Sequence, residues 1–176
     1  MKFSIQMLTK FIELFPAVFP MYGIHAETKH CLCSKKEGCE HSGKHPMGSV
    51  KKNETFKSLA EVELFLKNNI GSNFALLLDT FLDLVVVDVD KRNGGLESFD
   101  KLQKDFGTLP NTVTTLTGGD GLHLYFKVND KNCFQSKLDN YPGIDIKYNG
   151  LIMLPGSNHQ SGKKYVWKEN YSPNEI

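Results

Sequence analysis

The spacing of apolar residues predicts three amphipathic helices before Gly107. The first spans residues 1–15, where one stripe holds Ile5, Leu8, Ile12 and Phe15. The second begins at the capping-box pair Ser58 and Glu61 and runs to about Lys67. Its inward positions are Leu59, Val62 and Leu66. The third has its apolar stripe at Leu96, Phe99, Leu102 and Phe106.

Strand patterns dominate the rest of the chain. Continuous apolar runs predict buried strands at residues 74–78 and 84–89, and a proline-punctuated segment at 15–20 predicts an entry or short strand. Further strands are expected at residues 112–116, 122–128, 144–147, 151–154 and 164–167. This order predicts an α+β fold, with helices on one side of a mixed or mostly antiparallel sheet.

The clean alternation in residues 122–128 assigns each side chain to one face of its strand. One face holds Leu122, Leu124, Phe126 and Val128, and the other holds His123, Tyr125 and Lys127. We therefore expect His123 outside the core, on the polar face. Its position close after the glycine turn makes it a candidate functional residue, and an ordinary surface histidine on a hairpin is the alternative interpretation.

The composition describes one ordinary globular domain. We expect residues 1–170 to form it and residues 171–176 to be a linker to the rest of a longer protein. The net charge of +1 argues against a broad basic surface that wraps nucleic acid. Polar residues interrupt any signal-peptide core before Phe15, and no apolar run reaches the roughly 18 residues of a membrane span. A cytoplasmic location is therefore expected.

A metal site is expected in residues 25–53, a polar stretch with no apolar pattern to organise it. Cys31, Cys33 and Cys39 are close together there, whereas Cys133 is distant, which does not suit a disulfide framework. Three thiolates and one imidazole would make a tetrahedral zinc site. Candidates for the imidazole are His25, His30, His41 and His45. Free reduced thiols are the alternative.

Two pairs of charged residues on strands suggest a second metal site. Asp88 and Asp90 end the apolar run 84–87, and the two-residue period of a strand places both on one face. Such a pair can bind a divalent cation through oxygen ligands. Asp145 and Lys147 also share a face of a short strand and would add a third carboxylate and an ammonium group. Solvated strand ends and a surface salt bridge are the alternatives.

Two loops add candidate ligand-binding groups. Gly118, Gly119 and Gly121 precede the strand at residues 122–128, and glycines allow a ligand to approach the backbone. The turn-rich loop at residues 155–162 offers a hydroxyl and an imidazole, on Ser157 and His159. Loops of this composition are usually only turns.

Taken in order, these motifs are more specific than any one of them. They are Cys-x-Cys…Cys…Gly-Lys-His-Pro, Val-Val-Asp-Val-Asp-x-Arg-Asn-Gly-Gly, Thr-Gly-Gly-x-Gly-Leu-His-Leu-Tyr-Phe, Gly-Ile-Asp-Ile-Lys and Pro-x-Ser-x-His-x-Ser-Gly-x-x-Tyr. From about Phe15 to Trp167 the chain resembles the bifunctional DNA primase/polymerase amino-terminal domain of the archaeo-eukaryotic primase superfamily. The resemblance implies that superfamily's catalytic fold, with a mixed, RRM-like sheet, flanking helices and a small zinc-binding insertion.

The resemblance also implies site residues. Asp88, Asp90 and Asp145 match the carboxylates that bind two Mg²⁺ or Mn²⁺ ions, and His123 matches the histidine that contacts the incoming triphosphate. The glycine turn, Lys147, Ser157 and His159 sit where the family holds nucleotide or phosphate. Gly-Lys-His-Pro favours His45 over His41 as the fourth zinc ligand. Two departures are Gly121, where many members have serine, and Gly156, where the family has proline.

The implied activity is template-directed nucleotidyl transfer on single-stranded DNA, making or extending primers from NTPs or dNTPs. The family context is plasmid, phage or mobile-element replication, with a helicase or helical domain in the full-length protein. A metal-dependent nuclease could use the same carboxylates, and a catalytically silent nucleic-acid or zinc module is the other alternative.

Overall fold

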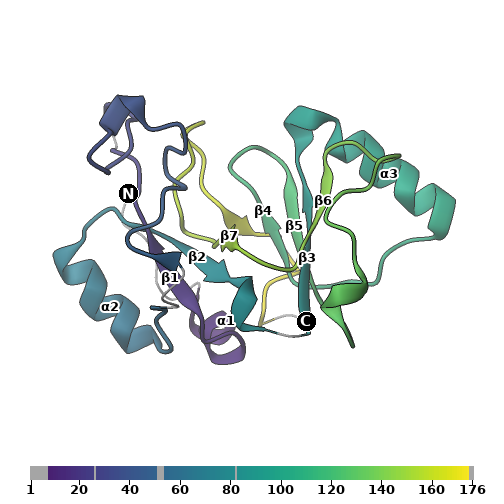
Figure 1. Cartoon of the computed structure of the whole chain (residues 1–176), viewed down its shortest axis with the longest axis horizontal. Coiled ribbons are helices and arrows are strands. Elements are labelled where there is room, and N and C mark those ends of the chain that lie inside the picture. Colours follow the sequence, from purple (N-terminus) through teal and green to yellow (C-terminus); the bar gives the residue numbers. More distant parts are fainter. Residues whose placement is uncertain (1–7, 26, 51–53, 82, 175–176) are drawn as a thin grey trace.

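The computed structural model describes residues 8–25, 27–50, 54–81 and 83–174 (Figure 1). Its helices are α1 (Thr9–Leu14), α2 (Leu59–Asn68) and α3 (Gly95–Phe106). Its strands are β1 (Val18–Met21), β2 (Asn73–Leu77), β3 (Leu84–Val89), β4 (Thr114–Leu116), β5 (Leu122–Lys127), β6 (Ile144–Lys147), β7 (Leu151–Met153) and β8 (Val166–Trp167). Single 3₁₀ turns are η2 (Lys36–Gly38), η4 (Leu78–Thr80), η5 (Lys91–Asn93) and η6 (Lys131–Cys133). The α+β class is confirmed.

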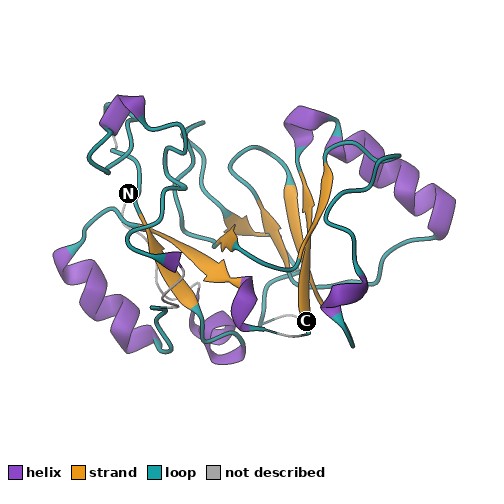
Figure 2. Ribbon diagram, viewed as in Figure 1, coloured by secondary structure: helices purple, strands orange, loops and turns teal. Residues whose placement is uncertain are grey.

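The strands form two antiparallel sheets (Figure 2). Of the two expected arrangements, the mostly antiparallel one is therefore confirmed and the mixed one is not, and there are two sheets where one was expected. The smaller sheet has the order β1-β2-β7, and the larger has the order β6-β3-β5-β4-β8. Every strand pairing within the described ranges is antiparallel. Apolar runs predict that β2 and β3 are both buried, but they do not reveal which strands pair. The segment that begins with η4 carries the chain from one sheet to the other.

The main apolar core includes side chains from both sheets and from the two helices nearest the smaller sheet. Its buried members include Phe11, Val62, Phe74, Leu76, Leu84, Val86, Tyr125 and Ile152. The Phe11 ring packs against Tyr125 and Trp167, with ring centroids 5.5 and 5.2 Å apart. Burial of each such side chain contributes roughly 1.5–3 kcal/mol. This core fixes the position of the two sheets relative to each other.

We expected the helices on one side of the sheet, but the structure places them at both ends of the molecule. α2 lies at the end of the molecule that carries the smaller sheet, and α3 lies beside β3 and β6 at the other end (Figure 1). The predicted capping box of α2 is present, because Ser58 and Glu61 bond to each other's backbone N–H groups. The C-cap of α3 is Gly107, whose φ of +93° favours glycine.

The first predicted helix is described only in part, as α1. Leu8, Phe11, Ile12 and Phe15 are buried, so the described part of the apolar stripe faces the core. Ile5 lies outside the described residues. No helix in the described part of the chain is both long enough and apolar enough to span a membrane.

The polar face predicted for β5 faces inward, which corrects the expectation for His123. His123 is 6% exposed and Tyr125 is 3% exposed, and Tyr125 belongs to the main core. Alternation along one strand separates its two faces, but it cannot show that a second layer covers the polar one. His123 is therefore a buried polar residue.

The segment after β8 folds back onto the larger sheet. The N–H of Thr114 donates to the carbonyl of Tyr171 over 2.9 Å, and Pro173 is buried. The first residues of the expected linker therefore belong to the folded unit.

Candidate active site

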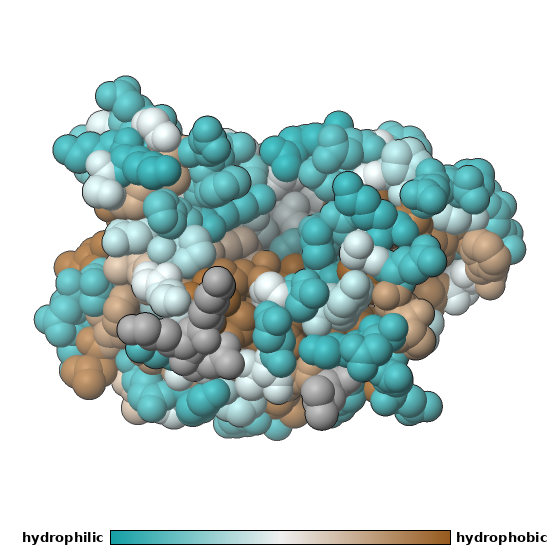
Figure 3. Space-filling model, in the orientation of Figure 1, coloured by the Kyte–Doolittle hydropathy of each residue, from teal (hydrophilic) through white to brown (hydrophobic). Residues whose placement is uncertain are grey.

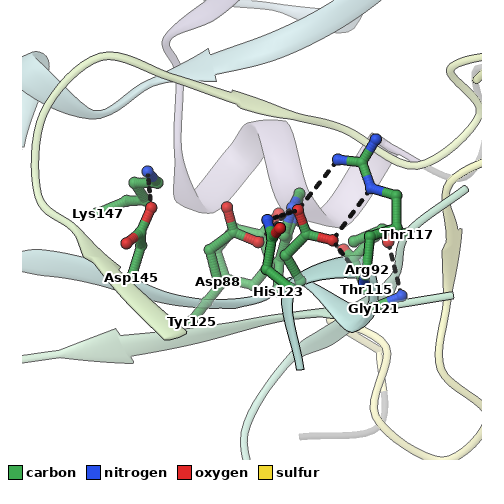
Figure 4. A network of polar contacts seen from close by, with 11 residues as sticks. Asp88, Arg92, Thr115, Thr117, Gly121, His123, Tyr125, Asp145 and Lys147 are labelled. Atoms are coloured by element: carbon green, nitrogen blue, oxygen red, sulfur yellow. Dashed lines mark hydrogen bonds and ion pairs between the residues drawn. The ribbon is translucent and has the colours of Figure 1, made fainter. Parts of the chain in front are cut away.

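Strand register places three of the predicted site residues in one row. Asp88 of β3 lies directly opposite Asp145 of β6 on one side and His123 of β5 on the other. Directly opposed side chains are close neighbours on one face of a sheet. Figure 4 shows the three side chains next to one another, with His123 Nε2 3.6 Å from Asp88 Oδ1. The row continues to Thr115 of β4.

Asp90 follows β3 and is held by the turn that comes after it. Its carboxylate accepts hydrogen bonds from the Arg92 backbone and from both ends of the Arg92 guanidinium, at 3.0–3.2 Å. Asn93 donates to it at 2.9 Å. The hydrogen bonds from the Arg92 side chain lower the pKa of Asp90 most strongly. The carbonyl of Gly143 accepts from the Asp90 N–H, which ties this turn to the start of β6.

The three carboxylates line one cavity of about 360 Å³. Its wall also includes Lys137, Asp139 and Tyr141. Asp88 and Asp90 are each about a quarter exposed, and Asp145 pairs with Lys147 at 2.7 Å. Hard carboxylate oxygens on one wall of an accessible cavity are the ligands that Mg²⁺ and Mn²⁺ prefer. The residues present therefore fit divalent cations.

A second cavity, of about 60 Å³, adjoins the same two aspartates and is lined by basic groups. Its lining comprises Lys44, Asp88, Val89, Asp90, Arg92, Thr117, Gly119, His123, His159 and Tyr165. Lys44 and Arg92 carry full positive charges there, and the two histidines can each gain one. Loss of hydration and then the charge of Arg92 lower the pKa of Lys44. Asp88 and Asp90 also line the cavity, so it would suit an anionic group such as a phosphate once cations offset these carboxylates.

The two histidines of this cavity lie on either side of Tyr165. Their ring centroids are 5.8 Å (His123) and 5.9 Å (His159) from that of Tyr165. Burial lowers the pKa of His123, and the charge of Asp88 opposes this shift. Loss of hydration also lowers the pKa of His159, followed by the charges of Lys44 and Arg92. Nδ1 of His159 lies 3.0 Å from the Ser161 hydroxyl oxygen and 3.2 Å from the Ser161 backbone nitrogen, so Ser161 orients the imidazole ring.

The glycine turn has a different role at each position. Gly119 lines the basic cavity, as a nucleotide-binding residue would. A Cβ on Gly118 would lie 2.1 Å from the Cβ of His159, so this glycine admits the neighbouring loop. A Cβ on Gly121 would lie 2.1 Å from the Val89 carbonyl oxygen, and its N–H donates to Thr117. Gly118 and Gly121 thus serve close packing.

Ser157 and Lys147 line neither cavity. Ser157 is fully buried, and its hydroxyl both donates to and accepts from the backbone of Phe74. It joins the loop to β2 and has no surface to offer a phosphate, so its assignment as a nucleotide ligand is not supported. Lys147 remains beside Asp145 as its ion-pair partner.

Five residues of the basic cavity were absent from the predicted site: Lys44, Val89, Arg92, Thr117 and Tyr165. Each lies inside one of the motifs quoted above, so the signal was present in the sequence. Lys44 was not predicted because the resemblance assigns a role only to the histidine of Gly-Lys-His-Pro. Nothing in the local pattern indicates that the metal-site loop reaches the carboxylates.

The predicted metal-site loop brings together Cys31, Cys33, Cys39 and His45. Their ligand atoms all lie within 4.8 Å of one another, and the Cys39 sulfur is 3.5 Å from Nδ1 of His45. His41 is exposed and is not one of the four. Burial raises the pKa of the Cys39 thiol to about 11, and a bound cation would reverse that shift. This Cys₃His cluster is compatible with zinc.

The two cavities lie in a molecule with a hollowed surface. In Figure 3 the hollow lies between the end that carries the Cys₃His cluster and the end that carries α3, and its rim is hydrophilic. Carboxylates beside a basic pocket are the arrangement of metal-dependent enzymes that act on phosphates. Comparison with known families identifies the class more closely. The chain belongs to the family of bifunctional DNA primase/polymerase N-terminal domains (Prim-Pol), whose model matches residues 11–176.

Family membership implies nucleotidyl transfer of the DNA primase/polymerase type, with DNA and nucleotides as substrates. Enzymes of this family are metal-dependent. A comparison with curated proteins gave no match.

Proposed function

We propose that the chain catalyses template-directed nucleotidyl transfer on single-stranded DNA, synthesising primers, extending them, or both. The observation that carries this proposal is the pair of cavities that share Asp88 and Asp90. The acidic cavity, of about 360 Å³, has the volume of a small-molecule site, and the basic one, of about 60 Å³, adjoins it. A nucleotide whose phosphates enter the basic cavity would bring its reacting phosphorus to the carboxylates.

In this proposal Asp88, Asp90 and Asp145 hold two Mg²⁺ or Mn²⁺ ions, which supply activation of a 3′-hydroxyl and stabilisation of the leaving pyrophosphate. The chain's own residues bind and orient the phosphates. The Arg92 guanidinium now binds Asp90 with two parallel hydrogen bonds, and a phosphate is a competing acceptor of the same geometry. His159 and His123 both become better hydrogen-bond donors as negative charge accumulates beside them, because that charge favours the imidazolium.

The basic cavity favours this function over a nuclease. A nuclease needs carboxylates and a positioned water, but it has no use for a pocket that binds polyphosphate. A silent interaction module would not require three carboxylates on one cavity wall. The Cys₃His cluster is proposed to hold a structural Zn²⁺. By the resemblance alone, we also propose a helicase or helical partner domain and a role in plasmid, phage or mobile-element replication.

The test is incubation of the chain with single-stranded DNA, labelled NTPs or dNTPs, and Mn²⁺ or Mg²⁺. A variant carrying Asp88→Ala and Asp90→Ala is the matched control. New oligonucleotides from the wild type alone are the expected result, and the nucleotide that is incorporated identifies the product as RNA or DNA. Metal-dependent degradation of the template would instead establish the nuclease. If the protein shows no synthesis and binds no nucleotide, the result would support the silent module.

A further inference from the structure

Lys44 reaches the basic cavity from the metal-site loop, although it is distant in sequence from the other cavity residues. It lines that cavity together with Asp88 and His159. The residue that follows it, His45, is one of the four members of the Cys₃His cluster. The same short segment thus contributes one side chain to the metal cluster and the next one to the proposed nucleotide site.

The backbone on both sides of Lys44 is anchored. The carbonyl of Gly43 accepts a hydrogen bond of 2.8 Å from the side-chain amide of Asn73, which is fully buried. The carbonyl of His45 accepts one of 2.8 Å from the N–H of Tyr22. Gly43 has a φ of +74°, and a Cβ there would lie 2.7 Å from the Ile24 side chain. This geometry leaves the backbone at Lys44 little freedom.

Asn73 also connects this segment to the loop that carries His159. Its amide donates a second bond of 2.8 Å to the carbonyl of Asn158, and its oxygen accepts one of 2.8 Å from the Asn158 N–H. A single buried side chain therefore holds Gly43 and Asn158, the residues immediately before Lys44 and His159. Three hydrogen bonds from one buried amide fix the relative position of the two loops.

We propose that Lys44 binds the polyphosphate of the nucleotide, and that the Cys₃His cluster holds it in position through His45. The inference rests on the proposed function, because it assigns part of the same site. It makes the cluster a determinant of nucleotide affinity as well as of local folding. Removal of the cluster's metal would release the His45 side chain, which restrains this segment in addition to the Asn73 and Tyr22 hydrogen bonds, and would so loosen the position of the adjacent ammonium group. Affinity for triphosphates would then fall more than affinity for monophosphates.

The experiment measures binding of a fluorescent nucleoside triphosphate and the matching monophosphate in the presence of Mn²⁺. The variants are Lys44→Gln, Lys44→Arg and Lys35→Gln, the last removing an exposed lysine of the same loop. Each protein is measured as purified and after its zinc is removed with a chelator, with bound zinc quantified by mass spectrometry. Mn²⁺ is restored before each titration.

Lys44→Gln is expected to weaken triphosphate binding about tenfold, since it removes one charge-assisted hydrogen bond. Monophosphate binding should change little, Lys44→Arg should retain most of the affinity, and Lys35→Gln should match the wild type. Zinc removal should reproduce the loss in the wild type and add nothing in Lys44→Gln, because both act through one group.

Unchanged triphosphate binding by Lys44→Gln would overturn the assignment of Lys44. Equal effects of zinc removal in the wild type and in Lys44→Gln would overturn the link to the cluster. In both cases nucleotide binding by the wild type would leave the proposed function standing. A wild type that binds no nucleotide at all would instead overturn the proposed function and this inference together.

Discussion

The two sheets contribute to the site in different ways. In the larger sheet, Asp88, Asp145 and His123 lie in one row because strand pairing fixes which residues are opposite. At the smaller sheet, Lys44 and His159 belong to loops, and the buried side chain of Asn73 holds the residues that precede them. The groups proposed to take part in the chemistry therefore lie on regular structure, whereas the groups proposed to bind substrate depend on a few side-chain hydrogen bonds. Rigid strands suit catalytic geometry, and loops suit variable binding groups.

The largest expected effect concerns the strand-borne row. Asp88→Asn should reduce nucleotidyl transfer at least about 1,000-fold, since metal activation supplies several kcal/mol and each 1.4 kcal/mol is tenfold. The fold should persist, because the side chain is about a quarter exposed. Rate assays and thermal unfolding check both statements, with the exposed Asp100→Asn on α3 as the control. If Asp88→Asn catalysed nucleotidyl transfer at a near-normal rate, Asp88 would not be part of the active site.

The second prediction concerns the metal-site loop. Cys33→Ser should lose bound zinc, because one of three thiolates is missing from the cluster, whereas Cys133→Ser should keep it. The zinc content of each purified protein checks this directly. The signal of the larger sheet in amide hydrogen exchange should be unchanged in both variants. If Cys33→Ser retained stoichiometric zinc, the cluster would not be the site.

The sequence allowed the positions of the three carboxylates to be predicted, because a strand's period is local information. Asp88 and Asp90 follow an apolar run, and Asp145 alternates with Ile144 and Ile146, so both faces could be assigned. The three carboxylates do line one cavity. The burial of His123 could not be predicted, because it depends on a second sheet whose strands come from distant parts of the chain.

The loop-borne part escaped prediction for a related reason. The neighbours of Lys44 in the cavity, such as Asp88 and His159, are distant in sequence. The loops of Lys44 and His159 are joined by Asn73, a polar residue of a strand. Asn73 looks like the polar boundary of an apolar run, yet it is fully buried. For Ser157 the reverse occurred: it was predicted as a nucleotide ligand, but its hydroxyl is hydrogen-bonded to the Phe74 backbone. A polar residue in a motif can serve the loop's structure as well as the ligand.

The third prediction tests Asn73 itself. Asn73→Ala should lower the free energy of unfolding by about 2–4 kcal/mol, because it leaves the carbonyls of Gly43 and Asn158 buried without their donor. Chemical denaturation measures this loss, with the exposed Asn129→Ala as the control. Nucleotide affinity should also fall in the folded variant, while the metal-binding carboxylates keep their geometry. Wild-type stability for Asn73→Ala would show that the two loops hold their positions without it.

The smallest expected effect is a change in the protonation of His159 when nucleotide binds. In the free protein the pKa of His159 is lowered, first by loss of hydration and then by Lys44 and Arg92, so the imidazole is neutral at pH 7. A polyphosphate beside it favours the imidazolium and raises that pKa, so binding takes up a fraction of a proton. Affinity should therefore increase as the pH falls from 8 toward 6.5.

Calorimetric titrations at pH 7 in two buffers of different ionisation enthalpy measure this proton uptake. His159→Gln keeps a polar side chain at the position but cannot gain a charge, so its uptake should be smaller than that of the wild type. The difference between the two proteins removes the contribution of the nucleotide's own phosphates. Equal proton uptake by the two proteins would mean that His159 stays neutral and acts only as a hydrogen-bond donor. Lys44 and Arg92 would then be the charged basic groups of the cavity.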